Sequence, residues 1–106
     1  MAIDVMLPYY GDVDHFKKAV DSVLAQSYTD FRLVVVDDGY PDPEPERYMG
    51  EIVARDSRVT YEKNETNLGA NGNYRKCVGM VTAPIVVIMG ADDIMLPNYL
   101  QVVADG

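Results

Sequence analysis

Apolar residues cluster in four short segments of the chain, separated by longer stretches with a different pattern. The clearest segment, residues 31–36, is apolar at consecutive positions from Leu33 and contains three valines in a row. A continuous apolar run of this length is typical of a strand that is covered on both faces, as in a parallel sheet. The four predicted strands are residues 3–7, 31–36, 58–62 and 85–89.

Between these strands, apolar residues recur at the three- and four-residue spacing of a helix. In residues 13–26 this spacing places Phe16, Val20 and Val23 on one face. Residues 64–73 (NETNLGANGN) are rich in Asn and Gly and predict a loop. The four predicted helices are residues 13–26, 46–56, 74–81 and a last helix from Pro97 to about residue 104.

The strands and helices therefore alternate strictly along the chain. This order predicts an α/β fold with a mainly parallel sheet, right-handed crossovers and helices on both faces. We find no internal repeat and no linker, so residues 1–106 are expected to form one unit.

Unusual residues follow three of the predicted strands. Residues 8–11 read PYYG, Asp37 and Asp38 follow the second strand, and Asp92 and Asp93 follow the last. In an open parallel sheet, ligands bind beyond the carboxyl ends of the strands. The sequence therefore predicts a pocket with aromatic walls and an acidic floor at that edge.

Carboxylates in such a pocket can do two things. They can accept hydrogen bonds from the N–H and O–H groups of a nucleobase or a ribose, or hold a hard cation such as Mg²⁺ or Mn²⁺. Aspartates after strands also commonly form turns or cap helices, and Tyr9 and Tyr10 could simply pack. Two acidic pairs at one sheet edge favour the binding interpretation.

Composition narrows the choice of partner. The chain has 17 acidic and 9 basic residues and a net charge of −8, which argues against nucleic acid and anionic lipid as partners. The single cysteine, Cys77, cannot form an internal disulfide and indicates a reducing, cytoplasmic compartment. We find no signal-peptide pattern and no apolar run near the ~20 residues that a bilayer requires.

Four segments carry a more specific pattern in their order along the chain. They read IDVMLPYYG, SVLAQSYTDFRLVVVDDGYPD, NLGANGNYRKC and MGADDIMLPNYL. In this order they resemble the motifs of the family 2 glycosyltransferases, over residues 3–100. The resemblance implies the Rossmann-like, nucleotide-sugar-binding half of a GT-A domain.

The resemblance also implies roles for individual residues. Asp38 would bond the edge of the nucleobase with Asp37 near the same subsite, and Asp92 would be a metal ligand assisted by Asp93. Gly90 departs from the family pattern, because many members have an acid there. The nucleotide-binding residues that the resemblance implies are Pro8, Tyr9, Tyr10, Asp37, Asp38, Asn67, Gly69, Asn73 and Ala91.

The implied activity is inverting, Mg²⁺- or Mn²⁺-assisted transfer of a sugar from a UDP- or dTDP-sugar to a hydroxyl of a saccharide or lipid-linked acceptor. The full-length protein would work in the cytoplasm or at the inner face of the membrane. The family's acceptor half, which supplies the general base, is expected to be absent. Such a truncated sheet would leave an apolar edge that favours self-association.

Two alternatives remain open at this stage. One is a non-catalytic nucleotide-binding module that keeps the pocket but does no chemistry. The other is a receiver-like domain, which needs a phosphorylatable aspartate after its third strand and a lysine after its fifth. Here the third predicted strand ends at Glu62 and Lys63 and no fifth strand is predicted, which disfavours that alternative.

Overall fold

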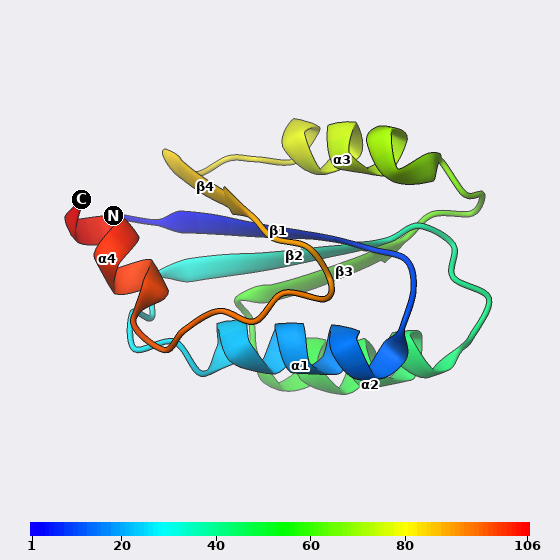
Figure 1. Ribbon diagram of the computed structural model, residues 1–106, viewed down its shortest axis with the longest axis horizontal. Helices are drawn as coiled ribbons and strands as arrows, with labels where there is room; N and C mark the ends of the chain where they lie inside the picture. Colours follow the sequence, from blue (N-terminus) through cyan, green and yellow to red (C-terminus); the bar gives the residue numbers. More distant parts are fainter.

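The computed structural model describes all of residues 1–106 and confirms the predicted alternation of strands and helices (Figure 1). Each predicted strand and helix is present, with shifts at some of the ends. The elements are β1 (Ile3–Tyr9), α1 (Val13–Leu24), β2 (Phe31–Asp37), α2 (Glu44–Arg55), β3 (Val59–Lys63), α3 (Gly69–Gly79), β4 (Ile85–Ile88) and α4 (Tyr99–Asp105).

The four strands form one sheet in the order β3-β2-β1-β4, and every neighbouring pair is parallel. β1 and β2 are the two central strands, and they pair along their full length from Ile3 opposite Phe31 to Tyr9 opposite Asp37. Because the strands are parallel, their carboxyl ends lie at one edge of the sheet. The loops that follow β1, β2 and β4 therefore meet at that edge.

The two faces of the sheet are covered differently (Figure 1). α1 and α2 cover one face, where a core cluster of 17 buried residues includes Leu7, Phe16 and Leu33. α3 covers the other face, where only Met6, Val34, Val36 and Cys77 form the buried cluster. Leu100 of α4 joins the larger cluster. Most of the apolar burial that stabilises the fold is therefore on the α1/α2 face.

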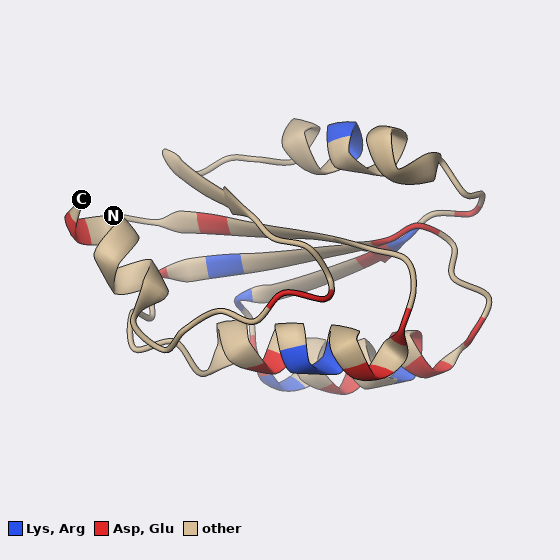
Figure 2. Cartoon of the chain, in the orientation of Figure 1, with Lys and Arg blue, Asp and Glu red and all other residues tan.

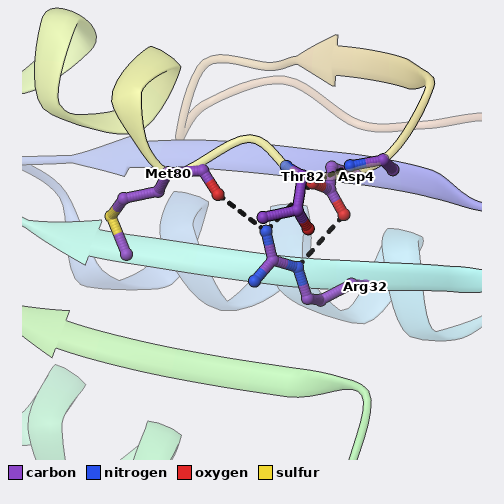
Figure 3. A network of polar contacts seen from close by, with 5 residues as sticks. Asp4, Arg32, Met80 and Thr82 are labelled. Carbon is purple, nitrogen blue, oxygen red and sulfur yellow. Dashed lines mark hydrogen bonds and ion pairs between the residues drawn. The ribbon is translucent and has the colours of Figure 1, made fainter.

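On the α3 face, an ion pair between the buried Asp4 and the partly exposed Arg32 takes the place of apolar packing (Figure 3). Asp4 and Arg32 are register partners on β1 and β2. Arg32 donates to both carboxylate oxygens of Asp4, at 3.1 Å from Nε and 2.9 Å from Nη2. The same carboxylate accepts the N–H groups of Thr82 and Ala83, and Arg32 also donates to the carbonyl of Met80. This network fixes the α3–β4 connection to the sheet.

The network also sets the charge state of Asp4. Burial by itself would raise the pKa of this carboxyl. The hydrogen bonds from Arg32, Thr82 and Ala83 outweigh burial, and the pKa of Asp4 lies below its usual value. Asp4 is therefore ionised near neutral pH and holds its partners as a carboxylate.

Several element ends differ from the sequence-based predictions; α4, for instance, begins at Tyr99 and leaves Pro97 outside the helix. Two of the differences bear on the pocket. β1 continues through Pro8 to Tyr9, whereas the predicted strand stops before Pro8. β4 pairs with β1 only as far as Met6, so the missing N–H of Pro8 faces a side with no strand partner. α3 begins at Gly69, inside the predicted loop, so the second half of NLGANGN is helical. None of the helices is long and apolar enough to cross a membrane.

Candidate functional site

A pocket with a volume of about 810 Å³ lies at the carboxyl edge of the sheet. It is formed by the ends of β1 and β2, the start of α1, the first half of α3 and the loop after β4. Its lining residues are Pro8, Tyr9, Tyr10, Asp12, His15, Asp38, Asn67, Gly69, Ala70, Asn71, Asn73, Tyr74, Ala91 and Asp92. All the residues predicted to form the site line this pocket except Asp37 and Asp93.

The end of β1 supplies the aromatic wall. Tyr9 is 1% exposed, stacks on Phe16 with ring centroids 4.0 Å apart, and donates its hydroxyl to the carbonyl of Gly11. Burial raises the pKa of the Tyr9 phenol, so this hydroxyl stays protonated and can serve as a donor. Tyr10 is 56% exposed and meets the edge of Tyr40. Tyr9 is thus part of the core, while Tyr10 presents a ring to the pocket.

Asp38 is the buried carboxylate of the pocket, with only 2% of its surface exposed. Its Oδ1 accepts hydrogen bonds from Asn64 Nδ2 at 2.9 Å and from the backbone N–H of Leu68 at 2.7 Å. Its Oδ2 accepts none, yet no fully buried side-chain polar atom in the protein lacks a partner. Oδ2 is therefore the oxygen that keeps some accessible surface, and it is available to a ligand in the pocket.

Asp37, the neighbouring acid, has a different environment. It is fully buried and does not line the pocket. Its Oδ1 accepts the backbone N–H of Tyr40 at 2.8 Å, and its Oδ2 accepts the hydroxyl of Tyr61 at 2.7 Å. Both oxygens of Asp37 are therefore used to hold the turn after β2 against β3.

Gly39 allows this turn to pass close to the end of β3. It has a φ of +78°, and a Cβ built there would lie 3.3 Å from the carbonyl oxygen of Asn64. A side chain at this position would be strained by the backbone conformation and crowded by the neighbouring backbone. Asn67 completes the join, because its Nδ2 donates to the carbonyl of Asp38 at 3.1 Å.

The loop after β4 brings the second acidic pair. Asp92 is exposed and lines the pocket, while Asp93 accepts the N–H of Gly90 through Oδ2 at 3.1 Å. A Cβ built on Gly90 would lie 3.1 Å from Asp92 Oδ1 and 3.0 Å from Asp93 Oδ2. The two carboxylates thus converge on the space that the glycine leaves open.

These two carboxylates fit the usual environment of a hard divalent cation. Mg²⁺ is commonly held by one or two protein carboxylates, with water and substrate phosphates completing the coordination. No group of three or more His, Cys, Asp or Glu residues in the chain forms an all-protein metal site. Asp92 and Asp93 could therefore hold such an ion together with oxygen atoms of water or of a ligand.

Acidic residues lie in two of the loops at this edge of the sheet. Figure 2 shows acidic residues where β2 ends and in the loop that follows β4, with further acids along the outer surfaces of α1 and α2. Lys76 of α3 is the basic residue nearest to Asp38 in the hydrogen-bond network, which it joins through Asn64. The pocket thus has acidic side chains at two points, Asp38 and Asp92, and the Lys76 ammonium lies behind Asp38.

Five lining residues were not predicted from the sequence as part of the site. Asp12 accepts the backbone N–H of His15 and so caps α1, which places both at the rim of the pocket. Ala70, Asn71 and Tyr74 lie on the first turns of α3. The interpretation of residues 64–73 as a loop hides the helical positions of Ala70 and Asn71, which α3 turns towards the pocket.

The known proteins with similar sequences include several glycosyltransferases. An uncharacterized glycosyltransferase of Methanocaldococcus jannaschii is 31% identical over 97 residues, covering 92% of this chain and 33% of that protein. An uncharacterized glycosyltransferase of Nostoc sp. is 28% identical over 103 residues, covering 95% of this chain and 31% of the relative. The chain thus spans about a third of the length of these relatives.

Solved structures show the same fold. S. aureus TarS 1-349 superposes with a TM-score of 0.87 at 21% identity, covering 99% of this chain and 32% of that one. The mannosyltransferase PcManGT from Pyrobaculum calidifontis, solved in complex with GDP-Man and Mn²⁺, gives a TM-score of 0.77 at 21% identity. It covers 94% of this chain and 30% of that one.

The family model described as "Glycosyl transferase family 2" matches residues 4–105, which is nearly the whole chain. The resemblance of the four sequence motifs is thereby confirmed, and so is the Rossmann-like GT-A fold. The chain belongs to glycosyl transferase family 2.

Proposed function

We propose that this chain is the donor-binding part of an inverting, metal-assisted glycosyltransferase that uses a nucleotide-diphosphate sugar. The observation that supports the proposal is the meeting of two different carboxylates in one pocket. Asp38 is buried with one oxygen free, which suits a fixed hydrogen bond to a nucleobase. Asp92 is exposed, which suits a cation shared with a diphosphate.

The positions of the remaining pocket residues suggest how each would contact or surround the donor. Tyr10 offers an exposed ring on which a base can stack next to Pro8. Asn67, Gly69 and Asn73 shape the wall formed by the start of α3, and Ala91 lies beside Asp92. We assign Asp37 an indirect part, since its carboxylate holds the turn that carries Asp38.

A bound Mg²⁺ or Mn²⁺ ion would neutralise the diphosphate and make it a better leaving group. We propose Asp92 as the ligand from this chain, with Asp93 assisting. A UDP- or dTDP-sugar is our preferred donor. The S. aureus TarS structures solved with UDP-GlcNAc and with UDP support a UDP-sugar, and the GDP-Man and Mn²⁺ complex of PcManGT supports the metal.

The general base has no candidate among the pocket's carboxylates. Asp12 accepts the N–H of His15, Asp38 is bonded to Asn64, and a metal-bound Asp92 would be a poor base. We therefore assign the base, and the site for a saccharide or lipid-linked acceptor, to a part of the protein outside these residues. The lack of a general base among the pocket's carboxylates also favours a second candidate function, a nucleotide-binding module without catalysis.

We also infer a cytoplasmic location for the full-length protein, at the inner face of the membrane if the acceptor is lipid-linked. The buried free thiol of Cys77 is compatible with a reducing compartment. Fractionation of cells that express the full-length protein tests this, and recovery outside the cytoplasmic membrane would contradict it.

The decisive experiment is a calorimetric screen of UDP, GDP and dTDP, each with and without Mn²⁺. We expect one diphosphate to bind in a metal-dependent way, and Asp92→Ala to remove the metal dependence. Asp38→Ala should weaken binding even without metal, by roughly 1–3 kcal/mol for a lost hydrogen bond to a charged group. Asp30→Ala, which removes an exposed acid just before β2, is the matched control and should bind like wild type.

The outcomes separate the parts of the proposal. Wild-type metal dependence in Asp92→Ala would show that the metal assignment is wrong. Failure of every nucleotide to bind would remove the donor-binding function itself. Where a diphosphate binds, an assay for slow hydrolysis of the corresponding nucleotide sugar distinguishes an enzyme from a binding module.

A further inference from the structure

Behind the pocket lies a buried polar network that the proposed donor contacts do not explain. Asn64 stands at its centre and is 6% exposed, although it does not line the pocket. Its Nδ2 donates to Asp38 Oδ1 at 2.9 Å and to Asn73 Oδ1 at 3.0 Å, and its Oδ1 accepts from Lys76 Nζ at 2.6 Å. Lys76 is paired in turn with Glu62, at 2.6 Å.

The partners of Asn64 fix which way its amide points. A lysine ammonium can only donate, so Lys76 must face the amide oxygen of Asn64. A carboxylate can only accept, so Asp38 must face the amide nitrogen. Both protons of that nitrogen are used, one by Asp38 and one by Asn73. The amide therefore has one orientation that satisfies all three partners.

This orientation has a direct consequence for Asp38. The hydrogen bonds from Asn64 and from the Leu68 backbone both go to Oδ1 and hold the carboxylate by one oxygen. The other oxygen is left free at the pocket. Asn73 is itself fixed, because its Nδ2 donates to the carbonyl of Val36 at 3.0 Å. The network is thus tied to β2, β3 and α3 at once.

We propose that Asn64 is the positioning residue for Asp38, and that Lys76 holds Asn64 in the orientation that presents Asp38 Oδ2 to the nucleobase. This inference rests on the proposed donor-binding function and extends it to two residues that do not touch the pocket. An orienting hydrogen bond of this kind lowers the cost of fixing the carboxylate when a ligand binds. The expected signature is a loss of affinity confined to the nucleoside end of the ligand.

The test uses the full chain and two probes for the two ends of the pocket. One probe is the nucleoside of whichever of UDP, GDP or dTDP binds best, and the other is pyrophosphate with Mn²⁺. Asn64→Ala should weaken the nucleoside about tenfold, as expected for one hydrogen bond to a charged group, and leave manganese pyrophosphate unchanged. A purely structural defect would weaken both probes together.

Asn64→Asp sharpens the test because it keeps the size of the side chain and its acceptor for Lys76. It removes only the donor and places a second carboxylate against Asp38, so we expect at least the loss seen with Asn64→Ala. Lys76→Met, at a half-exposed helix position, should weaken the nucleoside about threefold and serves as the readout if the Asn64 variants do not fold. Asn98→Ala, exposed at the start of α4, is the matched control.

The outcomes distinguish this inference from the function on which it rests. If Asp38→Ala binds the nucleoside like wild type, the assignment of Asp38 fails and the inference fails with it. If Asp38→Ala weakens the nucleoside but Asn64→Asp does not, only the positioning role is overturned. Equal losses for nucleoside and manganese pyrophosphate in Asn64→Asp would likewise overturn it.

Discussion

The two faces of the sheet are built from different interactions, although the same strands form both. On the α1/α2 face, 17 buried apolar residues pack together, and Leu33 of β2 is fully buried among them. On the α3 face the apolar cluster has four residues, and the Asp4–Arg32 and Asp38–Asn64 networks take up much of the contact. Apolar burial is strong but has no direction, whereas hydrogen bonds hold groups at fixed angles.

The comparison explains where the site is. A ligand that must be held by one particular carboxylate oxygen needs a rigid polar environment, and the α3 face supplies it. The α1/α2 face supplies the stability that offsets the cost of burying those polar groups. Substitutions of apolar residues on the first face should therefore act on folding, and those of polar residues on the second should act on the orientation of Asp38 or on the pH dependence of the stability.

The largest expected effect is on the apolar face. Leu33→Ala removes a fully buried side chain at the centre of the sheet, and we expect a loss of about 3 kcal/mol in the free energy of unfolding. Urea denaturation followed by circular dichroism measures it. Nucleotide affinity of the folded fraction should not change, and a loss below about 1 kcal/mol would show that this face is less tightly packed than described.

A smaller effect is expected from the ion pair on the α3 face. Asp4→Asn leaves Arg32 without its carboxylate, and because Arg32 is partly exposed we expect a loss of about 2 kcal/mol rather than the full cost of a buried unpaired charge. The effect should depend on pH. The folded-state pKa of Asp4 is depressed, so its contribution is present above the unfolded value of about 4 and is lost as the pH falls through the folded value.

The measurement for this second prediction is urea unfolding of both proteins at neutral and acidic pH. The difference in stability between wild type and Asp4→Asn should be largest near pH 7 and should shrink below about pH 4. Asp30→Asn, an exposed acid, is the control and should differ little from wild type. A difference between wild type and Asp4→Asn that stays constant across this range would contradict the assigned pKa direction.

The smallest effect is expected outside both faces. Lys17 and Glu44 form a surface ion pair between α1 and the start of α2, with Nζ and Oε1 2.8 Å apart. Both side chains are substantially exposed, so Glu44→Gln should change the stability by less than about 0.5 kcal/mol. That small change should disappear in 1 M salt. A loss comparable to that of Asp4→Asn would mean that surface charge, and not the sheet faces, dominates the polar contribution.

The sequence predicted the order of elements because β1, β2 and β4 are short and apolar, and because turn residues separate the strands from the helices. It misplaced the start of α3, since Asn and Gly at positions 69–73 have low helix propensity. The helix forms there because tertiary contacts outweigh that propensity. Asn73, for example, is buried and donates to the carbonyl of Val36, which is distant in sequence. Such contacts are invisible in a local pattern.

The site was predicted as two acidic pairs, and the structure gives the two members of each pair different surroundings. Asp38 and Asp92 line the pocket, whereas Asp37 and Asp93 bond to neighbouring backbone and to Tyr61. Sequence alone could not assign these parts, because adjacent residues in an irregular turn have no fixed alternation of side-chain direction. The supporting role of Asn64 was equally hidden, because it depends on Lys76 reaching it from α3.

The order of strands also bears on how the chain reaches its native state during synthesis. Among these four strands, β1 is made first but lies inside the sheet, and one of its two partners, β4, is made after β2 and β3. Until then β1 presents an open edge, and pairings of such high sequence separation form slowly. A nascent chain from which β4 has not yet emerged would therefore be the species most in need of a chaperone, and stalling translation before β4 leaves the ribosome should trap it.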